Sequence, residues 1–476
     1  MSMMNTVRAT TSVTIRVLGV ALALAGVACA VGQAGAGAPG AAGGQAGAGA
    51  PGAGAPGAGI QAGPGAVRPG AGAQAGSGAA RPGSGAAATG RYPNLFASLL
   101  GKTDAQVRAK IDVAWRQLFY GDSAKERIYY PVGDDMAFIE DILHRDVRTE
   151  GLSYGMMIAV QLGRQQEFDR IWTWTRTHLQ HEDGPLAGYF AWQARPDGSR
   201  MAQNPASDGE EWFATALLFA SGRWGDHGAI DYRAEANRIL EAMLHKEDAG
   251  AGGRVTNLFD HTTKEVVFVP MAGMASRFTD PSYHLPHYYQ LWARWAPRDN
   301  EFWCQAAARS RAYLHDALHP VTGLAPDYSA FDGRPFDPWG NEHADFRYDA
   351  WRVGANIGVD YAWFGADPWQ VEAANRLLAF FAGKGLTTYG SLWKLDGTEL
   401  PNAGHRTGLI ATNAVAALAA TDPRRTEFVR QLWLVQIPSG EERYYDGMLY
   451  FLALLEVSGN FRIYPPAGAA SAAAGC

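Results

Sequence analysis

Apolar residues recur at steps of three and four throughout residues 91–466, which is the spacing of one buried face on an α-helix. Segments such as DAQVRAKIDVAWRQLF and DYRAEANRILEAML show the pattern clearly. Thr103, Ser207 and Asp231 are plausible N-caps and Pro368 is a plausible first-turn proline, so helix starts are marked too. The predicted helices cover residues 103–119, 148–163, 165–180, 208–222, 230–246, 283–296, 299–317, 345–363, 368–384, 406–420, 423–434 and 443–458.

This succession of helices predicts an all-α fold. The clearest strand signal is the apolar segment KEVVFV at residues 264–269, and strands do not alternate with helices as they do in α/β proteins. Six helical hairpins can close into a double-layered toroid. An α-solenoid is the alternative, although the sequence has no repeat at a fixed short period.

Residues 1–30 have the features of an export signal. Arg8 and Arg16 precede the apolar run VLGVALALAGVACA, which is too short to span a bilayer comfortably and ends in small residues. Cleavage after Ala30 is the simpler interpretation. A lipid anchor on Cys29 is the alternative, and both predict a protein that acts outside the cytoplasm, whether periplasmic, secreted or lipid-anchored, with no membrane span.

Two flanking segments lack the large apolar groups of a core. Residues 31–90 consist largely of Gly, Ala, Pro and Gln, and we expect a disordered linker there, followed by one catalytic domain over residues 91–466. Residues 467–476 are expected to form a flexible tail. With Cys304 and Cys476 as the remaining cysteines, the sequence implies neither a disulfide framework nor a metal cluster, and we expect no cofactor.

Charge and aromatic content limit the choice of partner. A formal net charge of -6 and a pI near 6.1 give no basic field for nucleic acid or an anionic membrane. The chain has 15 Trp and 19 Tyr, whose rings suit hydrogen-bonding, amphipathic ligands such as sugars, although core packing explains most of them. We expect a monomer that binds a neutral or weakly charged ligand.

Three acidic residues occur where predicted helices begin or pass through apolar sequence. Glu150 opens GLSYGMMIAVQLG and Asp208 opens DGEEWFATALLFA, where a helix dipole alone can explain a carboxylate. Asp349 lies in the nearly uncharged segment FRYDAWRVGANIGVDYAWF, in which an ionised carboxylate needs a partner. Arg352 is that partner, in a structural ion pair or in a functional site.

The residues around these carboxylates favour a functional site. Gly151 and Gly155 flank Tyr154, and we interpret them as space for a ligand near Glu150. Tyr283, beside His284, offers a phenol. Paired carboxylates with aromatic walls and no metal signature are what the hydrolysis of a sugar bond requires, because one protonates the leaving oxygen and the other activates water.

Four motifs in order carry a family resemblance. The segments RDVRTEGLSYGMMIAVQLGRQQEFDRIWTW, ASDGEEWFATALLFA, TDPSYHLPHYYQLWARWA and YDAWRVGANIGVDYAWF together resemble glycoside hydrolase family 8, especially its members that release xylose from the reducing end of xylooligosaccharides. The resemblance covers residues 92–464. It implies an (α/α)6 barrel that hydrolyses β-1,4-xylosidic bonds with inversion.

The resemblance also implies individual roles. Glu150, in the TEG motif, is similar to the general acid of the family, and Asp349, in YDAWR, to the general base. Asp208, in SDG, resembles the residue that binds and distorts the sugar at the cleavage subsite, and Tyr283, in DPSY, the tyrosine that holds the nucleophilic water. Arg352 would orient Asp349. We add His284, Tyr154 and His405 as candidate substrate-binding residues.

The chain departs from the family pattern in two places. Glu210 stands where many members have a second Asp, and the loop before GLIA reads AGHRTG in place of a His-Leu-His-Pro plug that closes the cleft beyond the leaving xylose. His405 or Arg406 can take over that closure, or the cleft is open. The alternatives are therefore an endo-acting β-1,4-xylanase or β-glucanase of the same family, or a non-catalytic glycan-binding lipoprotein.

Overall fold

The structure of the protein is a computed structural model that describes residues 85–248, 250, 253–401, 404–470 and 476. The predicted signal peptide, Cys29 and most of the predicted linker lie outside these residues. In the described part, all twelve helices expected from the apolar periodicity are present, with ends that mostly differ by a few residues. Two further short helices precede them, α1 (Ala86–Thr89) and α2 (Leu95–Leu100).

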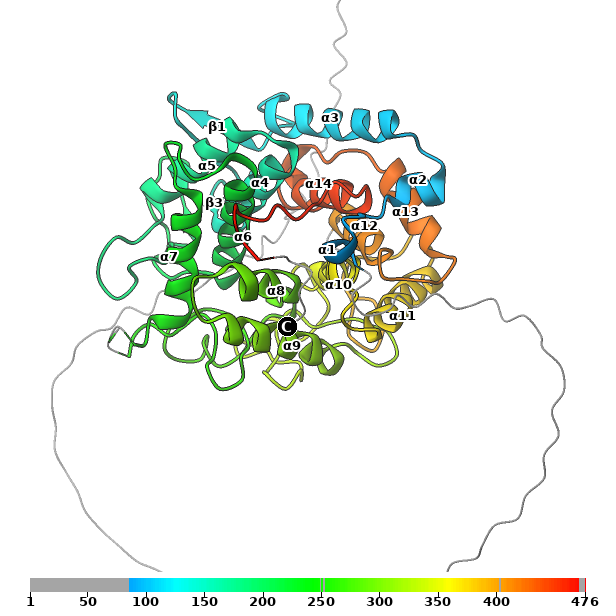
Figure 1. The fold of residues 1–476 in the computed structure, drawn as a ribbon. Helices are drawn as coiled ribbons and strands as arrows, with labels where there is room; N and C mark the ends of the chain where they lie inside the picture. The colour runs from blue at the N-terminus through cyan, green and yellow to red at the C-terminus, as the bar shows by residue number, and fades with distance from the viewer. Residues whose placement is uncertain (1–84, 249, 251–252, 402–403, 471–475) are drawn as a thin grey trace, which may run out of the picture. The chain divides into compact units, whose positions relative to one another are not determined.

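Six helices form a closed inner ring (Figure 1). Each contacts the next around the ring, and α6 and α8 are joined by a hydrogen bond from Nε1 of Trp292 to Oγ1 of Thr215, 3.1 Å long. These helices are buried on nearly all sides, which explains their almost continuous apolar sequences. They are α4 (Thr149–Leu162), α6 (Ser207–Trp224), α8 (Pro286–Trp295), α10 (Trp351–Phe364), α12 (Thr407–Ala416) and α14 (Tyr445–Val457).

Six outer helices cover this ring. Each packs one apolar face against an inner helix and turns a polar face to solvent, as in the pairs α4 and α5, α6 and α7, and α8 and α9. The outer helices are α3 (Asp104–Tyr120), α5 (Gln165–His178), α7 (Tyr232–His245), α9 (Asn300–Ala317), α11 (Trp369–Gly383) and α13 (Arg425–Leu434). The predicted all-α fold of six helical hairpins, an (α/α)6 barrel, is confirmed.

The strands are short and lie between helices. β1 (Tyr129–Val132) and β2 (Met136–Ile139) form an antiparallel hairpin, and β3 (Val147–Arg148) pairs with β4 (Gln193–Ala194) directly before α4. The strand predicted at residues 264–269 is wrong. Val266 forms only an isolated bridge to Phe259, because among the described residues no second strand runs beside this segment to build a ladder.

Both edges of the folded unit extend further than the sequence predicted. Gly85 packs so closely on α10 that a Cβ there would lie 2.3 Å from the carbonyl oxygen of Trp363, and Ala86 is buried. In the expected tail, the carbonyl oxygen of Ala470 accepts a hydrogen bond of 3.1 Å from Nε1 of Trp295. Gly and Ala lack bulk, so composition alone does not separate such docked residues from a linker.

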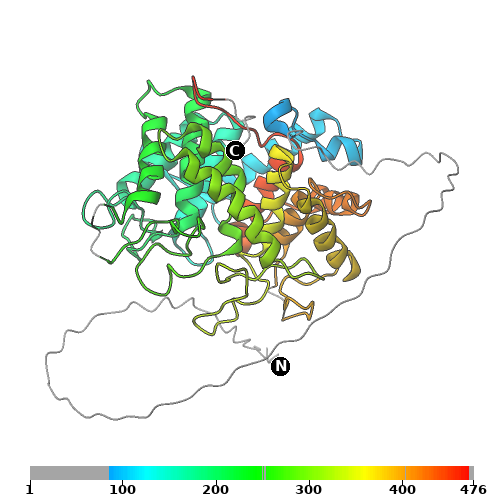
Figure 2. The ribbon, with the colours of Figure 1, turned by 60° about the horizontal axis from the view of Figure 1, so that its bottom comes forward.

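Long loops join the helices, and Figure 2 shows green to yellow loops gathered at the lower end of the helical body.

Within the described part of the chain, no helix combines the length and the apolar character needed to cross a membrane.

Candidate active site

Three acidic residues lie at the N-terminal ends of inner helices. Glu150 and Asp208 are the second residues of α4 and α6, and Asp349 lies two residues before α10. The sequence predicted that this last helix begins near residue 345. It begins at Trp351, because Phe346 is held extended by a pair of backbone hydrogen bonds to Trp393.

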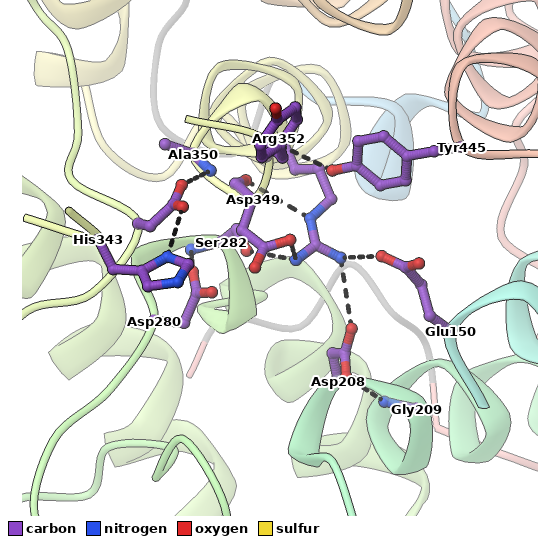
Figure 3. Close-up of polar contacts among 12 residues, drawn as sticks. Glu150, Asp208, Gly209, Asp280, Ser282, His343, Asp349, Ala350, Arg352 and Tyr445 are labelled. Atoms are coloured by element: carbon purple, nitrogen blue, oxygen red, sulfur yellow. Dashed lines mark hydrogen bonds and ion pairs between the residues drawn. The ribbon is translucent and has the colours of Figure 1, made fainter. Parts of the chain in front are cut away.

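Arg352 brings the three carboxylates together (Figure 3). Its Nη1 lies 2.9 Å from Oε1 of Glu150 and 3.3 Å from Oδ2 of Asp208. Its Nη2 donates to Oδ1 of Asp349 at 2.9 Å. The sequence predicted Arg352 only as the partner of Asp349, and the structure adds the two carboxylates from α4 and α6.

Two neutral hydroxyls also accept hydrogen bonds from this guanidinium. Nη1 of Arg352 donates to the phenol oxygen of Tyr154 at 2.7 Å, so this candidate is indeed within the cluster. Nη2 donates to Oγ of Ser282 at 2.9 Å. A planar fork of donors fits this arrangement, which a lysine ammonium would not satisfy.

Glu150 has the environment of a proton donor. Burial raises its pKa to about 7 against the attraction of Arg352. The neighbouring charges of Asp208 and Asp349 add to the increase. A carboxyl group with this pKa still carries its proton near neutral pH, which is what a general acid needs.

Tyr444, which the sequence analysis did not single out, holds the other oxygen of this carboxyl. Its hydroxyl donates to Oε2 of Glu150 at 3.1 Å from the residue preceding α14. The signal was its position in EERYYDG, at the start of the last predicted helix. The inner helices of a toroid present their ends at a common mouth. The start of this last inner helix is therefore expected at the same mouth as the segments that carry Glu150, Asp208 and Asp349.

Asp349 is the most exposed of the three carboxylates. Its side chain is 29% exposed, compared with 16% for Glu150 and 8% for Asp208. A base that takes a proton from water must be ionised and reachable by that water, and the contact with Arg352 stabilises its charged form.

Asp208 is fixed at both carboxylate oxygens. Oδ2 faces Arg352 and Oδ1 accepts a hydrogen bond of 2.9 Å from the backbone amide of Gly209. Burial raises its pKa above the usual value. Gly209 is required for packing, since a Cβ there would lie 2.5 Å from Oγ1 of Thr149 on α4.

The glycines near Glu150 pack against protein side chains. A Cβ on Gly151 would lie 2.5 Å from Cε2 of Tyr444, and one on Gly155 would lie 2.9 Å from Cγ1 of Ile139. The interpretation of both residues as space for a ligand is therefore wrong. Gly151 instead allows Tyr444 to approach Glu150.

Tyr283 borders the cluster and His284 does not. Tyr283 closes the short 3-10 turn η1 (Pro281–Tyr283), and its ring lies 5.7 Å from the guanidinium carbon of Arg352. The ring of His284 is fully buried and stacks on Tyr313. Its Nδ1 and Nε2 lie 2.9 Å from Oγ of Ser310 and 3.0 Å from Oγ1 of Thr279. Both ring nitrogens are thus occupied by protein hydroxyls, which argues against the predicted contact with substrate.

His405 lies beside the residues that precede α10. Its ring is parallel to that of Tyr348, at 5.9 Å and 15°, and its Nδ1 lies 3.1 Å from Oδ1 of Asp446. Burial opposes protonation, but the hydrogen bond with Asp446 raises the pKa of His405 above its usual value. Arg406 binds the protein backbone, since its Nη1 donates to the carbonyl oxygen of Tyr389 at 2.6 Å.

The site contains no metal-binding set. Within the described residues there is no group of three or more His, Cys, Asp or Glu side chains arranged to hold a metal ion.

Glu210, where the family pattern often has Asp, is fully buried and accepts a hydrogen bond of 3.1 Å from the backbone amide of Phe190. This contact assigns Glu210 a packing role.

Comparison with known proteins agrees with this arrangement. The model of the family described as glycosyl hydrolases family 8 matches residues 138–459. The reducing-end xylose-releasing exo-oligoxylanase Rex8A of Paenibacillus barcinonensis is 46% identical over 79% of this chain and 97% of its own length. A reducing end xylose-releasing exo-oligoxylanase of Halalkalibacterium halodurans is 44% identical over 80% of this chain and 96% of its own.

A solved structure gives the same result in three dimensions. The GH8 xylobiose complex from Teredinibacter turnerae superposes with a TM-score of 0.77 at 45% identity, covering 80% of this chain and 100% of that one. The residues that the family model matches include α4, α6, α10 and α14, whose N-terminal ends form the carboxylate cluster.

Proposed function

This chain belongs to glycosyl hydrolase family 8, and on that premise we propose that it hydrolyses β-1,4-xylosidic bonds of xylooligosaccharides with inversion, releasing xylose from the reducing end. The observation that carries the proposal is the pair Glu150 and Asp349 on one guanidinium. One carboxyl is buried with a pKa of about 7, and the other is partly exposed and paired. A buried carboxyl group that keeps its proton and a second carboxyl group that water can reach are what an acid and a base of this reaction require.

In this mechanism Glu150 gives its proton to the oxygen of the leaving xylose while Asp349 takes a proton from the attacking water. The two carboxylate oxygens are each 2.9 Å from a nitrogen of Arg352. Two contacts to one guanidinium set only an upper limit of about 8 Å between these oxygens, and this limit overlaps the lower part of the roughly 6.5–9.5 Å range of inverting enzymes. Asp208 binds the sugar at the cleavage subsite, and Tyr283 holds the water.

The length and names of the relatives support the choice of substrate. The two curated relatives described above, which carry the xylose-releasing description, match over nearly their whole length. The position of His405 supports action at the reducing end, because its ring lies beside Tyr348 with Nδ1 held by Asp446. Its Nε2 lies 3.4 Å from the exposed carboxylate of Glu442, and the two side chains can bind the hydroxyls of a terminal sugar together.

Endo-acting hydrolysis of xylan or β-glucan is the second candidate, because the loop at residues 400–407 lacks the expected plug sequence. Product analysis on xylotriose and on long xylan separates the two. We expect xylose and xylobiose from xylotriose, with the polymer untouched. Rapid shortening of the polymer would support the endo-acting enzyme, and binding without turnover would support a non-catalytic glycan-binding protein.

A further inference from the structure

The hydroxyl of Tyr289, on α8, lies between two hydrogen-bond acceptors. Its oxygen is 2.5 Å from Oε1 of Glu211, on α6, and 2.9 Å from the carbonyl oxygen of Tyr283. A phenol has one proton and cannot donate it to both oxygens. If Glu211 were ionised, one of these two short contacts would join two oxygens without a proton between them.

The surroundings of Glu211 also disfavour its ionised form. Its side chain is fully buried, and within the described residues it forms no ion pair and its Oε2 has no hydrogen-bond partner. The charged groups that act on it are Asp208, Glu210 and, with opposite sign, Arg352. Burial raises its pKa well above the usual value although the contact with Tyr289 opposes this.

We propose that Glu211 is a neutral carboxylic acid that donates to Tyr289, which in turn donates to the carbonyl oxygen of Tyr283. Each contact in this chain then contains one proton. Glu211 and Tyr289 act as positioning residues, since they fix the backbone from which the Tyr283 phenol extends. The inference rests on the proposed function, in which that phenol holds the attacking water.

Neighbouring contacts also hold the η1 turn, and Figure 3 shows the one between Ser282 and Arg352. The carbonyl oxygen of Ser282 accepts a hydrogen bond of 2.8 Å from Nδ2 of Asn356, and its Oγ accepts one from Arg352. Phe268 stacks on the ring of Tyr283 at 5.9 Å and 11°. The contact with Tyr289 adds a direct link from this turn to α8 and, through Glu211, to α6.

Tyr289→Phe tests the chain by removing one oxygen. We expect kcat on xylotriose to fall by about tenfold or more while KM changes less than about twofold, since misplaced water affects the chemical step more than sugar binding. Tyr288→Phe is the matched control. Tyr288 is also fully buried on α8, but its hydroxyl has no hydrogen-bond partner within the described residues, so both constants should be unchanged.

Two substitutions of Glu211 test its protonation state. The amide of Glu211→Gln can donate to Tyr289 as a neutral acid does, and kcat should stay within about threefold of the wild-type value. Glu211→Leu cannot donate and should behave as Tyr289→Phe does. Loss of activity in Glu211→Gln equal to that in Glu211→Leu would overturn the proposal, and so would a wild-type kcat in both Glu211→Leu and Tyr289→Phe.

Infrared difference spectroscopy decides the protonation state without any substrate. Between wild type and Glu211→Gln, at a pH above the pKa of Glu150, the carbonyl stretch of one protonated carboxyl group should be lost. The absence of that band would overturn the proposal even if Glu211→Leu fails to fold. Failure of the wild-type protein to cleave xylotriose would contradict the proposed function alone.

Discussion

Arg352 donates to Oε1 of Glu150 at 2.9 Å, although the two residues are 202 positions apart in the chain. The same guanidinium also faces Asp208 and Asp349, so one positive charge serves three carboxylates. One cation cannot balance three anions in a half-buried site, which favours a retained proton. Glu150, with its raised pKa, is the group that keeps it.

Glu150→Gln should remove the proton donor without disturbing the fold. We expect kcat on xylotriose to fall by about 10²–10⁴-fold, with an unchanged circular dichroism spectrum. A glycosyl fluoride, whose leaving group needs no proton, should lose much less activity. Glu372→Gln, at an exposed position on α11, is the control. Full activity of Glu150→Gln on xylotriose would refute the assignment.

The pH profile should report the same group. Because only protonated Glu150 can act as the acid, kcat/KM should fall as the pH rises through about 7. Asp208→Asn removes a negative charge that raises this pKa and should move the alkaline limb to lower pH, whatever its effect on kcat. An alkaline limb that stays in place in Asp208→Asn would contradict this coupling.

Gly151→Ala should harm both stability and activity. Its Cβ would lie 2.5 Å from Cε2 of Tyr444, whose buried ring has little room to move, so we expect a loss of roughly 1–3 kcal/mol in the free energy of unfolding. Displacement of the Tyr444 hydroxyl from Glu150 should lower kcat as well. In the control Gly155→Ala, the new methyl meets Cγ1 of Ile139, and stability should fall without a change in kcat.

His405→Ala tests the leaving-group end of the site. Loss of the imidazole held by Asp446 should raise KM for xylotriose by roughly tenfold, as expected for one lost hydrogen bond to a charged group, and reduce the share of xylose among the products of longer oligomers. His227→Ala, at an exposed position, is the control. An unchanged product pattern would show that another group closes the cleft.

The fold was predictable because its signals are local. The three- and four-residue periodicity of each helix depends on neighbouring residues only, and it located all twelve long helices. The carboxylates Glu150, Asp208 and Asp349 were identifiable as candidates for a related reason, since each lies near a helix start in an apolar segment.

Contacts between distant helices were not predictable in this way. Tyr444 meets Glu150 from the start of the neighbouring inner helix α14, and its own segment indicates a helix start but not that contact. His284 is adjacent to Tyr283 in sequence but not part of the site, because its imidazole contacts Thr279 and Ser310 instead. The sequence predicted that the lack of a side chain at Gly151 matters, but the reason is the ring of Tyr444, which packs against it.

The most direct test of the account follows xylotriose, labelled with carbon-13 at its reducing-end C1, by time-resolved NMR with the wild-type protein. With Glu150 as acid and Asp349 as base, labelled xylose should be released and unlabelled xylobiose should appear first as the α-anomer, because single displacement inverts the β bond. Xylobiose that appears first as the β-anomer, or label that stays in xylobiose, would contradict the account.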